Sequence, residues 1–218
     1  MNGFNIKLNP FVNLNEDIGI AVDSTGIKVA NRGEWIRRHH HHHHHDKYSS
    51  SSSTTTRKGF IKIHVAVDTR SKLILSIKVT KEDVGDGRML KSLVRDTITN
   101  VQQQTNIKRV LADGAYDSRD NFQFLHNSDI DPAIKVRKNS SIKSMGCYAR
   151  EMAVLQQLRN FDKWKHSVSY GRRWAAETVF SSMKRIFGEH IVSIKWNNII
   201  NELLMKAHIY NMFMQISH

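Results

Sequence analysis

The residues best suited to chemistry lie in SYGRRWAAETVFSSMKRIFGEH, residues 169–190, where Glu177 stands among arginines and lysines. On an ideal helix, at about 100° per residue, four polar side chains of this segment share an arc of roughly 60°. These are Tyr170, Arg173, Glu177 and Lys184. The opposite side is apolar and suited to packing on a core: Ala175, Ala176, Val179, Phe180, Met183, Ile186 and Phe187. The spacing therefore predicts a helix, ending at Gly188, that packs on one side and presents reactive groups on the other.

Two more acids give Glu177 its context. Arg173 and Glu177 alone would form an exposed i,i+4 ion pair that contributes only about 0.3–0.5 kcal/mol. However, Asp23 lies in a β-branched stretch, and Asp113 follows another apolar stretch, so an α/β fold can place all three acids together. Carboxylates from distant segments repel one another unless cations lie between them, and oxygen ligands suit Mg²⁺ or Mn²⁺. Two such ions about 4 Å apart would activate an attacking oxygen and stabilise a leaving one at a phosphodiester.

The chain is strongly basic. It contains 33 Lys and Arg residues against 20 Asp and Glu, which gives a formal net charge of +13. Between residues 133 and 196 there are thirteen basic residues and four acids. Such a surplus indicates a polyanionic partner, usually nucleic acid, although a solvated charged face is the alternative.

The remaining composition predicts one domain in a reducing compartment. The 218 residues are 39% hydrophobic, which suffices for a core. Cys147 is the only cysteine, so the chain has no internal disulfide and no cysteine cluster for zinc. No signal-peptide h-region or membrane-spanning apolar run is present, and we expect a cytoplasmic protein without membrane contact.

The elements that must position the three acids alternate between strands and helices. Strands are expected at 18–30, 60–68, 72–80, within 110–116 ending at Asp113, and at 132–138; helices at 86–104, 118–128, around Glu177 and at 199–216. This order predicts a mixed α/β sheet with flanking helices. The segments 39–56, with seven histidines and runs of Ser and Thr, and about 139–168 are expected to be a low-complexity surface loop and a basic connector.

The chain resembles the DDE transposases of bacterial and archaeal insertion sequences. The resemblance rests on AVDSTGIKV around Asp23, LADGAYDS around Asp113, and Y-x-x-R-x-x-x-E-x-x-x-x-x-x-K from Tyr170 to Lys184. It implies an RNase H-like catalytic domain at 18–217 after a short polar leader at 1–17. It also implies that Asp23, Asp113 and Glu177 are the catalytic, metal-binding triad. The implied DNA-binding residues are Tyr170, Arg173, Lys184 and the neighbouring Arg172.

This resemblance implies a function. The expected activity is DNA strand cleavage and 3′-OH strand transfer that depend on Mg²⁺ or Mn²⁺, with two ions. Its DNA partners would be transposon ends and target DNA, handled by a homo-oligomer associated with the nucleoid. Because only about 17 residues precede the first strand, we also expect a copy without its end-recognition region. Two alternatives stay open: a nuclease of the same fold without strand transfer, and a non-catalytic DNA-binding remnant.

Other candidate residues are expected to be structural. Asp117 precedes an apolar helix and should cap it rather than bind metal, and Asp68 should occupy a turn. Trp174 is expected to pack rather than to stack on a base. The dispersed histidines show no metal-ligand spacing: His64, His126, His166, His190 and His208.

Overall fold

The computed structural model describes residues 8, 17–29, 60–101, 105–141 and 146–216. The segment 39–56 and most of the leader lie outside the described residues. The leader residues that the structure describes are Leu8, whose side chain is buried in the core, and Asp17. The described strands are β1 (Ile18–Val29), β2 (Phe60–Asp68), β3 (Ile74–Lys81), β4 (Ile107–Ala112), β5 (Asp131–Ile134) and β6 (His190–Ile191). The described α-helices are α2 (Leu90–Asn100), α3 (Arg119–Asn127), α4 (Tyr148–Arg159), α5 (Phe161–Ser167), α6 (Trp174–Phe187) and α7 (Trp196–Ile216).

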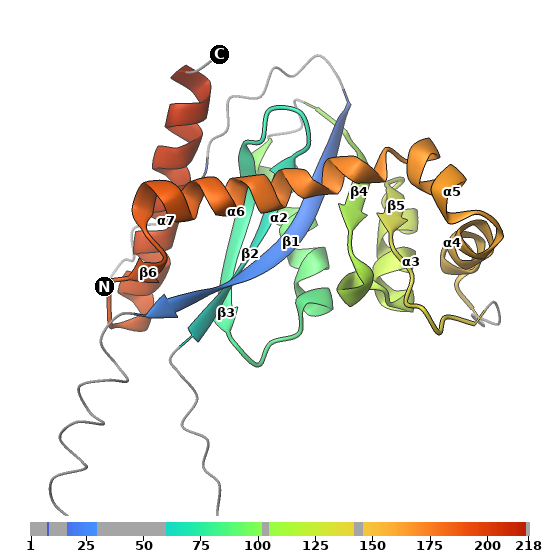
Figure 1. Ribbon diagram of the computed structural model, residues 1–218, viewed down its shortest axis with the longest axis horizontal. Helices are drawn as coiled ribbons and strands as arrows, with labels where there is room; N and C mark the ends of the chain where they lie inside the picture. The colour runs from blue at the N-terminus through green and yellow to red at the C-terminus, as the bar shows by residue number, and fades with distance from the viewer. Residues whose placement is uncertain (1–7, 9–16, 30–59, 102–104, 142–145, 217–218) are drawn as a thin grey trace, which may run out of the picture.

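The strands form one mixed sheet in the order β3-β2-β1-β4-β5, and β6 pairs with the end of β1. The first three strands are antiparallel neighbours, whereas β4 and β5 run parallel to β1. In Figure 1, α6 crosses one face of the sheet, and α2 and α3 lie on the other. The expected α/β class, a mixed sheet with flanking helices, is confirmed, and its RNase H-like character stays a prediction.

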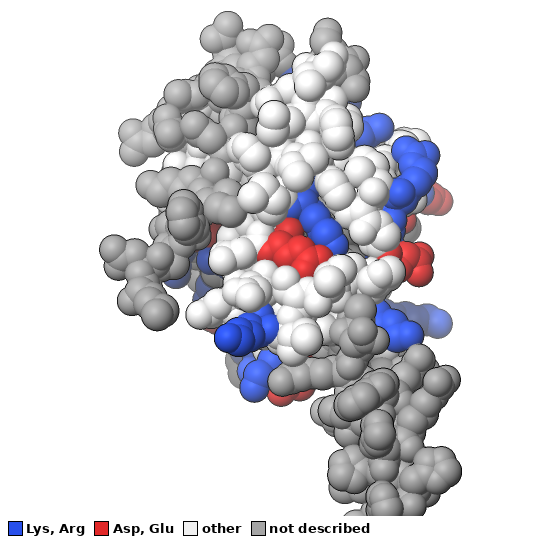
Figure 2. All heavy atoms as spheres, turned by 90° about the vertical axis from the view of Figure 1, so that its left-hand side faces the viewer, with Lys and Arg blue, Asp and Glu red and all other residues white. Residues whose placement is uncertain are grey.

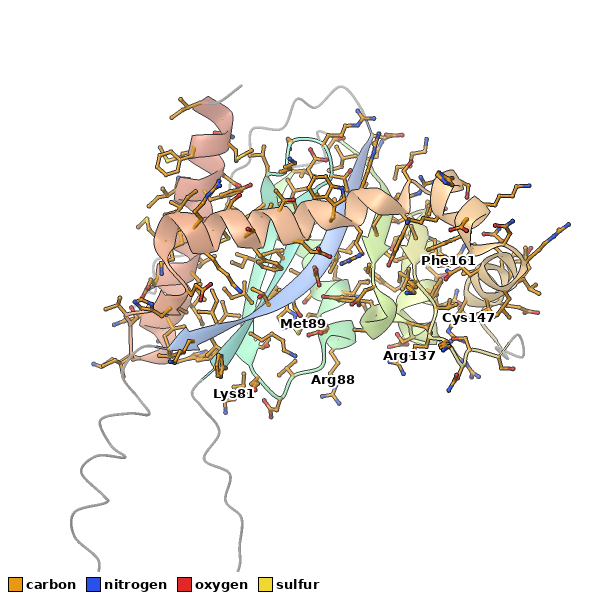
Figure 3. All side chains as sticks on the ribbon, in the orientation of Figure 1. Lys81, Arg88, Met89, Arg137, Cys147 and Phe161 are labelled. Atoms are coloured by element: carbon orange, nitrogen blue, oxygen red, sulfur yellow. The ribbon has the colours of Figure 1, made fainter. Side chains whose placement is uncertain are left out.

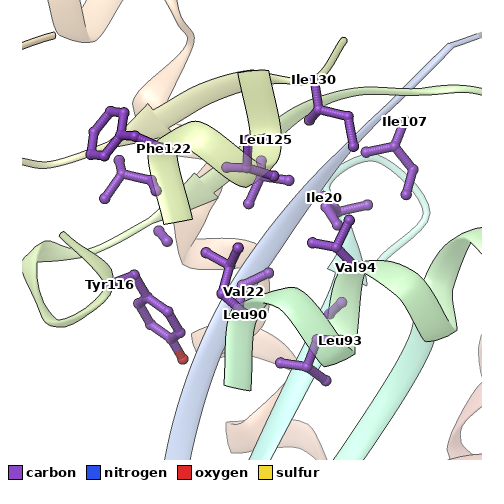
Figure 4. Packing of buried hydrophobic residues seen from close by; sticks show 14 of the residues in the cluster. Ile20, Val22, Leu90, Leu93, Val94, Ile107, Tyr116, Phe122, Leu125 and Ile130 are labelled. Atoms are coloured by element: carbon purple, nitrogen blue, oxygen red, sulfur yellow. The ribbon is translucent and has the colours of Figure 1, made fainter. Parts of the chain in front are cut away.

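Successive side chains of β1 point to opposite faces of the sheet, so the strand contributes to two separate core layers. Ile20 and Val22 join a cluster with α2 and α3, part of which Figure 4 shows, while Ala21 packs with α6 and α7. Asp23, two residues after Ala21, therefore faces α6. The apolar side of α6 is buried as its spacing predicts, through Ala175, Ala176, Val179, Phe180 and Met183.

Several element boundaries differ from the sequence prediction. The strand expected within 110–116 starts earlier, at Ile107, and ends at Ala112. Residues 114–116 form a 3₁₀ turn because the Asp113 side chain accepts a hydrogen bond from Ala115 N (2.8 Å). The helix expected at 86–104 begins with a 3₁₀ turn at Asp86–Met89 before α2. The helix of Glu177 likewise begins with a 3₁₀ turn, at Tyr170–Arg173, and ends at Gly188, whose φ of 81° suits glycine.

The segment expected to be a basic connector contains two helices, α4 and α5. Their apolar periodicity is weak because α4 buries only Ala153, Val154 and Gln157, and α5 buries only Trp164. The described part of the chain contains no helix long and apolar enough to cross a membrane.

Candidate active site

Asp23 and Asp113 come together through the parallel pairing of β1 and β4. Ala21 pairs with Leu111, and two residues further along each strand lie Asp23 and Asp113. Asp23 Oδ1 accepts a hydrogen bond from Ser24 N (2.8 Å), and its side chain is 18% exposed. Asp113 is only half-buried and lies just past the end of β4. The two carboxylates thus lie side by side, near the carboxyl end of β4 and on the side of the sheet that α6 covers.

The carboxylates influence one another. Burial is the largest cause that raises the pKa of Asp23, and the negative charges of Asp113 and Glu177 raise it further. The hydrogen bond from Ser24 N and the positive charge of Arg173 oppose this rise. Three acids from distant parts of the chain therefore share one electrostatic environment.

Arg173 connects Asp23 with Glu177. Its Nη1 lies 3.3 Å from Asp23 Oδ2, and its Nη2 donates to Glu177 Oε1. Arg173 and Asp23 are largely buried, whereas the Glu177 side chain is 55% exposed. The pair expected from the i,i+4 spacing is present, but it is part of a bridge to the sheet and not an isolated surface contact.

The three acids fit a hard divalent cation by type and charge, because they are oxygen ligands that repel one another. Their side chains are not arranged as a finished ligand set, since Arg173 engages Asp23 and Glu177. Among the residues that the structure describes, no group of three His, Cys, Asp or Glu side chains could hold a metal ion as it stands.

Tyr170 lies beside the triad but is buried. Its hydroxyl donates to the carbonyl oxygen of Ala112 (3.1 Å), the residue that precedes Asp113. Its ring packs on Trp164, with the ring centroids 5.1 Å apart. Burial raises the pKa of Tyr170 to about 12. The side chain therefore supports the end of β4, and its contact with DNA stays a prediction.

Arg172 and Lys184 lie at different places, Arg172 in the 3₁₀ turn before α6 and Lys184 in the last turn of α6. Arg172 is exposed and lines a pocket of about 120 Å³, here called the cationic pocket, together with Arg70, Lys108 and Arg109. One acid, Asp17, also lines it. Lys184 is half-buried near the end of α6, beside Thr25 of β1. Figure 2, which views the α7 side, shows a mostly uncharged face, so the basic surplus is not gathered there.

Asp117 was expected to cap the helix that follows it, and this expectation is wrong. Ser118 caps α3 by accepting from Asn121 N (3.2 Å). Asp117 is instead buried and bound by Arg150, through Nε at 2.7 Å and Nη2 at 2.9 Å. Sequence reasoning missed this pair because the two residues lie 33 positions apart without a shared motif.

The other candidate residues divide between confirmed and wrong predictions. Asp68 ends β2 and holds the turn that follows, where it accepts hydrogen bonds from the backbone N–H groups of Arg70 and Ser71. His64 is fully buried, and its Nε2 lies 2.9 Å from Thr80 Oγ1, in keeping with a structural role. Trp174 does not pack in the core: it is 56% exposed, and Lys72 Nζ lies 5.4 Å from its ring centroid.

A comparison with known protein families agrees with the motif pattern. The model of the family described as transposase DDE domain matches residues 15–212. Among solved structures, a Mos1 transposase paired-end complex with the left transposon end is similar at 7% identity and a TM-score of 0.34, covering 68% of this chain and 55% of that chain. A pre-cleavage Mos1 transpososome is similar at 12% identity and a TM-score of 0.32, covering 91% of this chain and 55% of that chain. The chain spans about half the length of these proteins.

Proposed function

The chain belongs to the transposase DDE domain family, and on this premise we propose that Asp23, Asp113 and Glu177 are its catalytic, metal-binding triad. The proposed reaction is DNA strand cleavage followed by 3′-OH strand transfer. The observation that carries the proposal is the convergence of three acids from β1, the end of β4 and α6. The charges of Asp113 and Glu177 raise the pKa of Asp23, and Arg173 bridges Asp23 to Glu177.

These carboxylates would hold two Mg²⁺ or Mn²⁺ ions, whose chemistry would be to polarise the phosphodiester and activate the attacking hydroxyl group. Asp23 is the most rigid ligand, because it is partly buried and held by Ser24 N on the central strand. Asp113 keeps one oxygen on Ala115 N, which orients the other oxygen. Glu177 is exposed on α6 and approaches the site from the solvent side.

Arg173 is the residue that would connect the triad to the substrate. Its guanidinium offsets part of the negative charge of Asp23 and Glu177, and it carries donors of the kind that bind phosphate in pairs. A DNA phosphate that accepted these donors would free carboxylate oxygens for the cation. We assign Arg173, together with Arg172, Lys184 and Tyr170, to the DNA-binding side of the site.

The proposed substrates are transposon ends and target DNA. The cationic pocket supports a phosphate contact outside the triad, because Lys108 and Arg172 are exposed at its rim. Joining two transposon ends to a target requires two active sites, so we propose a homo-oligomer that works at the nucleoid in the cytoplasm.

The test compares wild type with Glu177→Gln on labelled duplex DNA in Mn²⁺. We expect wild type to nick DNA, and a pre-cleaved end with a free 3′-OH to be joined to a second duplex. The Glu177→Gln variant should lose nicking by a factor of about 100 or more, since the amide keeps the helix but removes a charged ligand. DNA affinity should change little. Glu189→Gln, an exposed acid just beyond α6, is the matched control.

The outcomes separate the candidate functions. Equal nicking by wild type and Glu177→Gln would contradict the triad assignment. Nicking without joining would favour the nuclease alternative. DNA binding without metal-dependent chemistry in wild type would favour the remnant.

A further inference from the structure

The turn that carries Asp113 is held by a buried ion pair. Residues 113–117 leave β4 through a 3₁₀ turn, in which Asp117 N donates to Gly114 O (3.3 Å). The Asp117 side chain is fully buried, and Arg150 contacts both of its oxygens from the first turn of α4. A carboxylate at the end of the Asp113 turn is thus joined to a helix from the segment between β5 and α6.

Two more donors complete the shell around Asp117. Arg137 N donates to its Oδ2 (3.0 Å), and Ser140 Oγ lies 3.2 Å from the same atom. Arg150 Nη2 also contacts Ser140 Oγ (3.0 Å). Burial disfavours the charge, but the hydrogen bonds from Arg150 and Arg137 outweigh it and lower the pKa of Asp117.

The same segment also holds the first half of the turn. Arg137 Nε donates to Gly114 O (3.3 Å), and Lys135 N donates to Ala112 O (3.1 Å). Arg137 and Cys147, which precedes α4, lie on the same side of the molecule in Figure 3. On its other side the turn is anchored by Tyr116, which is buried in the cluster with Leu90 and Val22 (Figure 4).

These contacts leave the turn little freedom. Two adjacent residues at its end are fixed, Tyr116 by burial of its ring and Asp117 by four polar contacts. Asp113 lies between β4 and this clamped turn, and its carboxylate takes its direction from the bond to Ala115 N within the turn. A loosened Asp117 would release the backbone that orients Asp113.

We propose that Asp117 and Arg150 are positioning residues, which hold the Asp113 turn so that its carboxylate faces Asp23. The inference rests on the proposed function, because it assumes that Asp113 binds the metal ion. It gives α4 a role in the active site, although α4 contributes no ligand. A purely structural ion pair would change stability without changing how tightly the triad binds a cation.

The test measures Mn²⁺ affinity by electron paramagnetic resonance of free Mn²⁺ on the full-length chain. Every variant carries serine in place of His39 to His45, since imidazoles would bind the probe. We expect Asp117→Asn and Arg150→Met to raise the Mn²⁺ dissociation constant about tenfold, as loss of residues that orient metal ligands does. Arg150→Lys keeps the charge and one donor, and should give an intermediate rise of about threefold.

The matched control is Asp131→Asn. It breaks the Arg109–Asp131 ion pair (2.5 Å), which joins the same strands β4 and β5 at the end away from Asp113. This variant should keep the wild-type Mn²⁺ affinity. Urea unfolding, measured for all variants, reports any loss of stability separately from loss of metal binding.

The outcomes distinguish the two proposals. Folded Asp117→Asn and Arg150→Met proteins with wild-type Mn²⁺ affinity would overturn the positioning role, provided that Asp113→Asn weakens binding. If Asp113→Asn binds Mn²⁺ like wild type, the assignment of Asp113 as a metal ligand is wrong, and the positioning role that rests on it is overturned with it. Should the two stronger variants not fold, Arg150→Lys decides: an unchanged dissociation constant overturns the inference, and a rise of about threefold supports it.

Discussion

Arg173 and Asp23 lie 150 positions apart in the sequence and are joined by an ion pair at 3.3 Å across the face of the sheet. The same guanidinium also binds Glu177. Because both Arg173 and Asp23 are largely buried, this contact is less screened than a surface ion pair. Arg173 therefore acts as a counter-charge to the acids of the proposed triad and engages oxygens that the proposed metal ion would need.

This relationship predicts that Arg173→Gln strengthens metal binding in the absence of DNA. Removing a positive charge from the carboxylates should lower the Mn²⁺ dissociation constant by a factor of about three to ten. The same variant should bind DNA more weakly, since it has lost a phosphate donor. Titrations of both ligands against Arg172→Gln provide the control, because Arg172 contacts no triad residue in the described structure and should affect DNA alone. Weaker Mn²⁺ binding by Arg173→Gln would contradict the competition.

The cationic pocket predicts the salt dependence of DNA binding. Lys108→Ala and Arg172→Ala should each lower the slope of log K against log salt by about one, because each removes one phosphate contact. Fluorescence anisotropy of a labelled duplex, titrated at salt concentrations from about 50 to 300 mM, measures this slope. Lys81→Ala, an exposed lysine at the far edge of the sheet on β3, is the control. An unchanged slope in both pocket variants would exclude the pocket from the DNA path.

Local patterns predict much of this fold, because alternation and helical spacing record which side of an element is buried. The stripe from Ala175 to Met183 is an example. The helices α4 and α5 are not predicted in this way, because they lack a clear apolar stripe. In α4 a polar residue, Gln157, is buried and forms hydrogen bonds with the backbone of Val136 and Ile134.

Pairings across the chain are harder to predict than elements. Tyr170 and Arg173 are expected on one helical face that presents reactive groups, yet both lie in the 3₁₀ turn before α6, where Tyr170 is buried against Ala112 and Arg173 reaches Asp23. Spacing within a helix also does not predict the ion pair between Asp117 and Arg150, because that contact depends on the position of α4 relative to β5. Tertiary structure, not local pattern, decides the partner of a buried charge.

The burial of His64 predicts that the free energy of unfolding falls in mild acid. Burial, reinforced by Lys62 and opposed by Asp86, lowers the pKa of His64 to about 4. The unfolded chain takes up the proton near pH 6.5, whereas the folded protein resists until about pH 4, so stability is full above pH 6.5 and falls between these values. The loss at pH 5 should be about 2 kcal/mol.

Urea unfolding at pH 7.5 and pH 5 measures this effect. His64→Gln should lose stability at both values but show a smaller difference between them, by about 2 kcal/mol. His126→Gln, on the exposed end of α3, should retain the wild-type difference. A wild-type pH dependence that survives in His64→Gln would assign the effect to other groups.

The last prediction concerns the contact between α6 and the sheet. Ala175 and Ala176 are buried, at 3% and 0% exposure, and their small side chains allow the helix to lie close to the strand that carries Asp23. Ala176→Leu should overpack this layer and cost about 1–3 kcal/mol, because a tight core accommodates extra volume only by moving the helix. Movement of α6 would also carry Glu177, a proposed metal ligand, away from Asp23, so Mn²⁺ affinity should fall together with stability. Met183→Leu, a swap of similar volume on the same buried side, should cost less than about 1.5 kcal/mol and leave Mn²⁺ binding unchanged. Calorimetric unfolding and Mn²⁺ titration of both variants check the prediction, and an Ala176→Leu protein with unaltered Mn²⁺ binding would show that the triad tolerates a shift of its helix.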